Sequence, residues 1–131
     1  VILMISISYL EGNQQYREGK ISLNDSPNFF KKAIKRIFPE IILNGSNEEI
    51  LNIIYNQVRC GLFHDGMTRP SITINGEHEN SISFSNSNII INPYKFLDKI
   101  IRDFENYISE LKNPSNKVLR ENFRLRFAET R

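Results

Sequence analysis

The sequence lacks the features of a disulfide-stapled or membrane-spanning protein. It contains one cysteine, Cys60, which excludes an internal disulfide framework and indicates a reducing compartment. It has no tryptophan, and no run approaches the roughly 18 apolar residues of a membrane-spanning helix. The apolar start is short, has no basic segment and runs into Glu11 and Gln14, unlike a signal peptide. These absences predict a cytoplasmic protein with no membrane partner.

Length and charge leave the class of function open. The chain has 131 residues, which predicts one domain over residues 1–131, and 40% hydrophobic with 24% charged residues is ordinary for a globular protein. The net charge of +2 neither demands nor excludes a nucleic-acid partner. The first residue is Val1 rather than methionine, so both an upstream segment and an unusual start codon remain open.

Helical periodicity predicts a mainly α fold, a helical bundle of about five helices. We expect helices over residues 2–17, 27–38, 93–112 and 115–128, and one from a capping box at Ser46 and Glu49 to about residue 63. Gly19 and Pro39 are the expected stops of the first two, and Ser26-Pro27 and Asn92-Pro93 are expected starts.

The same periodicity predicts which faces are buried. In the helix 27–38 the apolar residues should point inward, with the cations on the solvent side: Lys31, Lys32, Lys35 and Arg36. In the helix 93–112 the expected buried stripe is Leu97, Ile100, Ile101, Phe104, Ile108 and Leu111. Asp98 with Arg102, and Lys99 with Asp103, should pair on its outer surface. In the last helix Val118, Leu119 and Phe123 should pack inward.

Residues 71–91 have a different pattern, in which isoleucine and phenylalanine alternate with polar residues. Turn signals at Asn75-Gly76 and over residues 85–88 divide this segment. We expect two or three short strands, a hairpin or meander inserted before the fourth helix.

The segment most suggestive of chemistry is Tyr55 to Pro70, YNQVRCGLFHDGMTRP, which places Arg59 and His64 five positions apart near a helix end. Two interpretations stand side by side. In one, both side chains only complement the helix dipole and its free carbonyls. In the other, the histidine is a general base and the arginine binds a phosphate.

The second interpretation corresponds to cleavage of RNA without a metal. The base would take the 2′-hydroxyl proton, and the resulting alkoxide would attack the adjacent phosphorus to give a 2′,3′-cyclic phosphate. Five residues of ideal helix turn by about 140°, so Arg59 and His64 would not share a face. Convergence requires either that the helix tighten or end near Gly61, or that Arg59 of one subunit meet His64 of another.

The chain resembles the HEPN superfamily, whose members are small helical bundles with an R-x4-6-H motif at a helix end. The segment Arg59 to His64 fits R-x4-H, and the longer block RCGLFHDGMTR is similar to an uncharacterised bacterial HEPN-like family. Three further segments are similar to that family, so the resemblance covers nearly the whole chain: YLEGNQQYREGK, FFKKAIKRIFP and INPYKFLDKIIRDFENYISELK.

The resemblance implies a metal-independent endoribonuclease of the toxin or phage-defence kind, with no cofactor. It implies a homodimer with two motifs facing a shared cleft, RNA as a partner, and an antitoxin or other protein partner. Arg59 would be the phosphate-binding residue and His64 the catalytic residue. Cys60 stands where active members often carry a polar residue. The alternatives are a non-catalytic HEPN-like module that binds RNA, a nucleotide or a protein, and a purely structural subunit.

Other residues are supporting candidates. Asp65 is placed to orient His64, or forms only a turn with Gly66, and Glu11, Arg17 and Arg69 are candidates for the same cleft or for plain solvation. Glu77-His78-Glu79 has no partner at metal-ligand spacing, so no metal is expected. Two basic clusters, residues 31–36 and 117–131, fit RNA phosphates or simple solvated helix faces.

Overall fold

Five helical segments and a small sheet make up the protein in a computed structural model that describes residues 2–21, 24–39, 47–65, 72–85 and 88–128. The helices are α1 (Ile2–Glu18), α2 (Ser26–Ile37), the continuous run α3 (Asn47–Ile53), η2 (Ile54–Arg59) and α4 (Cys60–Asp65), then α5 (Pro93–Lys112) and α6 (Lys117–Ala128). The strands are β1 (Ile72–Ile74), β2 (Ile82–Ser85) and β3 (Asn88–Ile91). The predicted mainly α fold with a β insertion before the long helix is confirmed.

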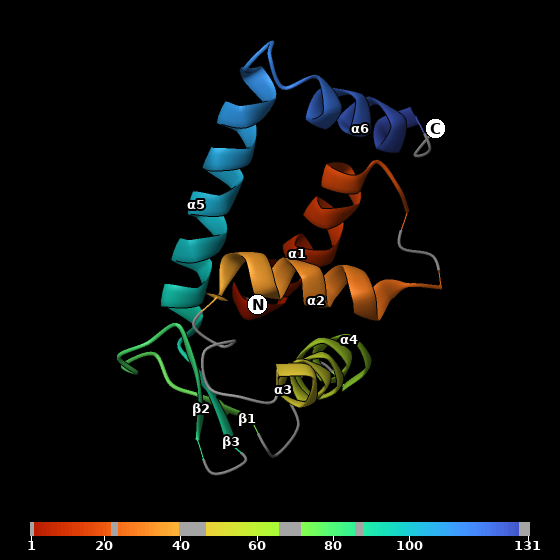
Figure 1. Ribbon diagram of the computed structural model, residues 1–131. Coiled ribbons are helices and arrows are strands. Elements are labelled where there is room, and N and C mark those ends of the chain that lie inside the picture. The colour runs from red at the N-terminus through yellow and green to blue at the C-terminus, as the bar shows by residue number, and fades with distance from the viewer. Residues whose placement is uncertain (1, 22–23, 40–46, 66–71, 86–87, 129–131) are drawn as a thin grey trace.

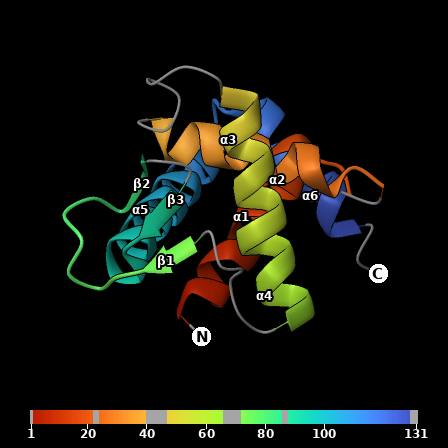
Figure 2. The same ribbon diagram turned by 90° about the horizontal axis from the view of Figure 1, so that it is seen from below.

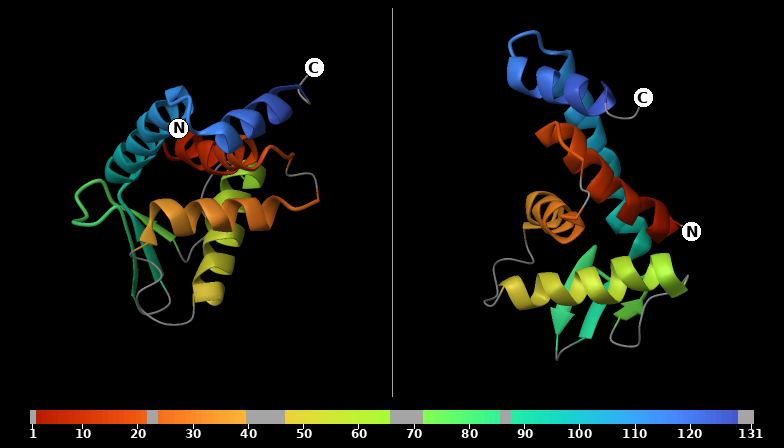
Figure 3. Two further views of the ribbon diagram at one scale, coloured as in Figure 1. Left: turned by 45° about the horizontal axis from the view of Figure 1, so that its top comes forward. Right: turned by 90° about the vertical axis from the view of Figure 1, so that its right-hand side faces the viewer.

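Helix α1 is the central element. It packs against α2, α5 and α6, and Figures 1 and 3 show α6 at one end of the molecule with the sheet and α3–η2–α4 at the other. The view from below in Figure 2 shows the long α3–α4 run crossing beside α1 and α2. A core forms between α1, α2, α3–η2, β3 and α5, and its fully buried side chains are Leu10, Phe30, Ile34, Phe38, Leu51, Val58, Ile89, Ile91 and Phe96.

The sheet combines a hairpin with one parallel strand. β2 and β3 pair antiparallel, with Ile82 opposite Ile91, and β1 pairs in parallel with β3, giving the order β1-β3-β2. The predicted strands are all present, but alternation of apolar residues carries no information on which strand lies beside which. Ile74 and Phe84 are exposed because the core covers only part of the sheet.

Helix ends follow the residues that the sequence offers. Gly19 has φ of 70°, a conformation that glycine adopts without strain, and it ends α1 as predicted. Asn92 starts α5 by accepting hydrogen bonds from the N–H groups of Tyr94 and Lys95, with Pro93 following. The expected cap Ser26 is instead the first residue of α2, preceded by Asp25. The expected cap Ser46 lies outside the described residues.

The predicted buried stripe of α5 is confirmed for Ile100, holds in part for the half-buried Leu97, Ile108 and Leu111, and is wrong for two members. The buried side chains are Phe96, Ile100 and Tyr107, while Ile101 is exposed and Phe104 is 49% exposed. The covered face is set by α1 and the end of α2, where Phe96 stacks on Phe38 with ring centroids 4.3 Å apart. Periodicity shows that a helix has an apolar side, but it cannot show which neighbours cover it.

Two further predictions about faces are confirmed only in part, since Phe123 packs against Tyr16 and Lys32 and Lys35 are exposed as expected. Val118 is 74% exposed, and α6 has no fully buried side chain because it crosses only the end of the bundle. Arg36 and Lys31 are half-buried rather than on the solvent side, since both cations have acidic partners on neighbouring elements.

Two substitutions on α5 test the observed face. Phe96→Ala should lower the free energy of unfolding by about 3–5 kcal/mol, because it removes a fully buried ring. Phe104→Ala, the same change on a half-exposed ring, should cost about 1 kcal/mol or less. Urea unfolding measures both, and equal losses would contradict the observed orientation of the helix.

Candidate functional site

Arg59 ends a wider turn of helix. Residues Ile54–Arg59 form a π-helical segment, and the N–H of Cys60 donates to the carbonyl of Tyr55, five positions back. Such segments are rare in helices and occur frequently at functional sites. No residue pattern in the sequence signalled it.

Two contacts orient the Arg59 side chain, and a hydrogen-bond network that reaches a third element supports them. Its Nη2 lies 3.2 Å from Glu11 Oε1 on α1, and its guanidinium lies over the Tyr55 ring, 5.5 Å from the centroid. Ser26 of α2 donates to the same Glu11 oxygen at 2.5 Å, and the Tyr55 hydroxyl donates to Ser26 at 3.1 Å. The Ser26 hydroxyl therefore stabilises this network instead of capping α2.

A pocket of about 230 Å³ lies beside this network. It is lined by Arg59 and by one face of α1, which includes Ser8, Glu11 and Gln15. Both partners of the ion pair are half-buried, so the pair is partly shielded from solvent screening. Of the supporting candidates, Glu11 thus lies with Arg59. The guanidinium is placed to bind an anion that enters the pocket and competes with Glu11 for it.

His64 and Asp65 share a helix with Arg59. The backbone continues as helix through Gly61 to Asp65 and changes from the wider π-helical turn to α-helix at Cys60, so the helix does not end near Gly61. Across this α-helical step, five residues turn by about 140°. The side chains of His64 and Asp65, and all of Arg69, lie outside the described part of the structure.

Arg17 lies in a different cluster from Arg59. Its Nε donates to Asn13 on α1 at 2.8 Å, and its Nη atoms lie 3.6 Å from Asp103 and 3.7 Å from Glu110 on α5. The guanidinium also stacks over the Tyr107 ring, 4.8 Å from the centroid. Arg17 therefore links α1 to α5 and does not line the Arg59 pocket.

Asp103 is the centre of this second cluster, which we call the α1–α2–α5 ionic cluster: Tyr9, Asn13, Gln14, Arg17, Arg36 and Asp103. Arg36 of α2 forms an ion pair with Asp103, and the Tyr9 hydroxyl donates to its other oxygen at 2.7 Å. Arg36 also donates to Gln14 at 3.2 Å. Asp103 is only 13% exposed, so its predicted place on the outer surface with Lys99 is wrong.

Burial changes the acidity of the cluster's groups. It raises the pKa of the Tyr9 phenol well above its usual value, and the hydrogen bond to Asp103 adds to that rise. Burial lowers the pKa of the Arg36 guanidinium, an effect that the Asp103 charge opposes. Sequence reasoning assigns the charged members of this cluster to the solvent-facing surface and so does not find the cluster. The spacing of Asp103 does indicate a buried position, since Asp103 follows Phe96 and Ile100 at helical intervals on the buried face.

The remaining candidate, His78, contacts a neighbouring strand rather than a cluster of metal ligands. His78 Nε2 lies 2.7 Å from the Ser83 hydroxyl. Among side chains that the structure describes, no three of His, Cys, Asp and Glu lie close enough to hold a metal ion. No helix within the described ranges is both long and apolar enough to span a membrane.

Replacing Asp103 tests whether the ionic cluster stabilises the fold. Asp103→Asn should lower the free energy of unfolding by about 3 kcal/mol, because it leaves half-buried Arg17 and Arg36 without their shared counter-charge. Asp98→Asn, the same change at an exposed position of the same helix, should stay within about 0.5 kcal/mol. Urea unfolding of both variants gives the comparison. Similar losses of unfolding free energy in the two variants would show that the ionic cluster does not specifically stabilise the fold.

The raised pKa of Tyr9 predicts a loss of stability at alkaline pH. Above pH 10 tyrosines in the unfolded chain lose their protons while Tyr9 keeps its proton in the folded protein, so stability falls by up to about 1.4 kcal/mol per pH unit. Tyr9→Phe should be less stable than the native protein at pH 8, and this difference should shrink as pH rises above 10. Parallel stability curves from urea unfolding at pH 8 to 11 would show that Tyr9 is not responsible.

The chain matches no protein-family model, and comparison with curated proteins and with solved structures finds no significant match. The HEPN resemblance therefore stays a prediction, and the candidate site depends on the geometry around Arg59.

Proposed function

We propose that this protein is a metal-independent endoribonuclease of the HEPN type, with Arg59 binding the scissile phosphate and His64 acting as general base. The observation that carries the proposal is the oriented Arg59 side chain, held by Glu11 and Tyr55 at the edge of a pocket. The helix that bears it also bears His64. The resemblance of the block RCGLFHDGMTR to HEPN motifs supports the same assignment.

The proposed reaction needs a base, a phosphate ligand and a proton for the leaving group. Neutral His64 would take the 2′-hydroxyl proton, and the 2′-oxygen would bond to phosphorus as the bond to the 5′-oxygen breaks. The products are a 2′,3′-cyclic phosphate and a 5′-hydroxyl, whose proton comes from an acid or water. Arg59 would stabilise the negative charge that grows on the non-bridging oxygens.

A dimer would bring Arg59 and His64 together. Because about 140° of helix separates Arg59 from His64, we propose that Arg59 of one subunit faces His64 of the other across a two-fold axis. Such a symmetric pair forms two equivalent sites. Asp65 and Arg69 would support these sites, and the protein would work in the cytoplasm, with an antitoxin or other protein as its regulator.

Glu11 is proposed as a positioning residue. In the absence of RNA it holds the Arg59 guanidinium and neutralises its charge. An RNA phosphate presents more acceptor oxygens and would share or displace that partner.

One observation favours a second candidate function, a non-catalytic module that binds RNA, a nucleotide or a protein. Arg59 is already paired with a half-buried carboxylate, and the next residue is Cys60, a weak hydrogen-bond partner. In this alternative the network around Arg59 only joins α1, α2 and η2.

Cleavage of a mixed-sequence RNA in EDTA tests the proposal. The native protein should produce fragments with cyclic-phosphate ends, and Arg59→Ala or His64→Ala should each slow cleavage by about 100-fold or more. Two matched controls, His78→Ala and Arg120→Ala, change the same residue types away from the site and should keep the native rate. No cleavage by folded, dimeric native protein would favour the binding module.

Mixing the two inactive variants tests the arrangement across subunits. Each mixed dimer would contain one intact site and one doubly altered site, so exchange of subunits should restore about a quarter of native activity. If cleavage is lost in both variants but mixing restores nothing, the nuclease assignment survives and the shared site does not.

A further inference from the structure

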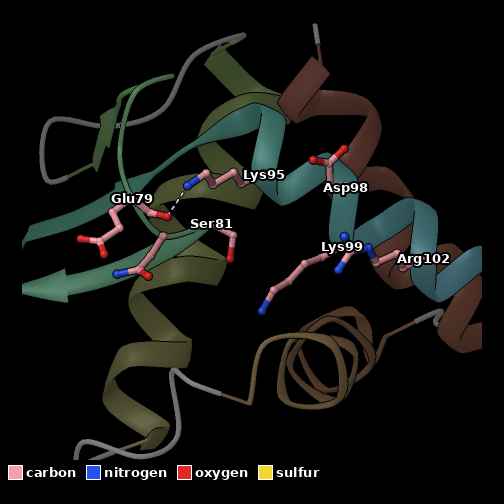
Figure 4. A pocket seen from close by; sticks show the side chains of 7 residues that line it. Glu79, Ser81, Lys95, Asp98, Lys99 and Arg102 are labelled. Atoms are coloured by element: carbon pink, nitrogen blue, oxygen red, sulfur yellow. Dashed lines mark hydrogen bonds between the residues drawn. The ribbon is translucent and has the colours of Figure 1, made fainter.

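A second pocket, of about 270 Å³, lies between α5 and the loop that leads into β2, apart from the Arg59 pocket. Three cations of α5 line it: Lys95, Lys99 and Arg102. Figure 4 shows these side chains on one side of α5, with Ser81 and Glu79 from the loop opposite them. We refer to this site as the α5 basic pocket.

The spacing of the three cations places them along one face of the helix. Positions 95, 99 and 102 follow the i, i+4, i+7 pattern, and seven residues of helix cover about 10 Å. The capping of α5 by Asn92 fixes the start of this row. Asn92 also donates to the carbonyls of Gly76 and His78, which ties the loop to the helix and holds the two sides of the pocket together.

The cations of this pocket are engaged differently from those of α2. Lys31 and Lys35 both pair with Glu48, whereas Lys95 donates to the backbone carbonyl of Glu79. Among the described residues Arg102 forms no ion pair, although Asp98 stands four positions before it. The predicted Asp98–Arg102 pair is therefore absent.

The acidic residues at this pocket do not close it. In the view of Figure 4 the Asp98 carboxylate points upward, whereas the Lys99 side chain extends downward, and the Glu79 carboxylate points away from Lys95. Lys99 itself lies over the Phe38 ring, 5.4 Å from the centroid.

We propose that the α5 basic pocket binds phosphate groups, and that they belong to the backbone of single-stranded RNA. Two lysine point charges and an arginine fork in an open hollow fit phosphoryl oxygens and make no demand on base identity. The phosphate chemistry comes from the pocket, while the choice of RNA as its source depends on the proposed nuclease function. The pocket would hold the RNA strand away from the bond that is cut.

Salt dependence of RNA binding tests this site without any need for cleavage. The probe is a fluorescein-labelled 12-nucleotide RNA with 2′-O-methyl sugars, which cannot form a cyclic phosphate, followed by anisotropy at 50 to 200 mM salt. Each lost phosphate contact should reduce the slope of log K against log salt by about 0.7, so the triple variant Lys95→Gln, Lys99→Gln, Arg102→Gln should lose about 2. The conservative double variant Lys95→Arg, Lys99→Arg should keep the native slope.

A matched control removes the same charge elsewhere. The triple variant Lys112→Gln, Lys117→Gln, Arg120→Gln changes three exposed cations at the other end of α5 and on α6, and it should keep most of the native slope. Equal losses in the two triple variants, or no RNA binding by native protein, would overturn the proposal. Unfolding curves confirm that each variant is folded.

Three further outcomes identify the source of the phosphate and distinguish this proposal from the nuclease proposal. If calorimetry with inorganic pyrophosphate shows binding that the Lys95, Lys99, Arg102 variant loses while its RNA binding is native, the ligand is a small anion and the RNA assignment is wrong. RNA binding that depends on the pocket, without any cleavage of unmodified RNA, would support this site and refute the nuclease. Cleavage of RNA that the substitutions in the α5 basic pocket leave unchanged would support the nuclease and refute this binding site.

Discussion

The carboxylate of Asp103 is the group on which the arrangement of the helices most depends. It accepts a hydrogen bond from Tyr9 of α1, pairs with Arg36 of α2 and lies 3.6 Å from Arg17. An unpaired charge in such a half-buried place is costly, so the helices are held at the positions that satisfy it. Apolar packing between helices tolerates sliding by small amounts, whereas these directional contacts do not. The ionic cluster therefore fixes where α1 lies relative to α2 and α5.

Helix α1 carries that fixed geometry to the candidate site. Tyr9, Asn13 and Arg17 recur every four residues and form the side of α1 that meets Asp103 and Arg36. Glu11, which holds Arg59, lies on nearly the opposite side of the same helix, because the two residues from Tyr9 to Glu11 turn by about 200°. A movement of α1 large enough to break one set of contacts would strain the other. The orientation of Arg59 thus depends on a charge that lies outside its own pocket.

The sequence was sufficient for the helices and strands but not for their neighbours. Gly19, Asn92 and Pro93 act locally, through backbone conformation and capping, and each lies at the helix end that it was expected to mark. Phe96 and Phe104 are alike to a periodicity argument, and only the positions of α1 and α2 decide that one is buried and the other half-exposed. Arg36 and Asp103 were assigned to solvent because a charge is usually exposed, a tendency that paired charges on facing helices override.

The same distinction applies to the candidate site. Arg59 could be found as a residue type near a helix end, and Glu11 as a carboxylate on the first helix. Their pairing depends on the π-helical segment from Ile54 to Arg59. Its wider turn accommodates one more residue than an α-helical turn. The extra residue shifts the side-chain positions of the following helix by about 100° relative to those of α3. Ile50 and Leu51 before the segment and Val58 and Leu62 within and after it all remain buried, while Arg59 faces Glu11. The wider turn lies where a continuous helix must satisfy both the core and a charged partner. The π-helical segment therefore ends at Arg59, the residue on which the proposed chemistry depends.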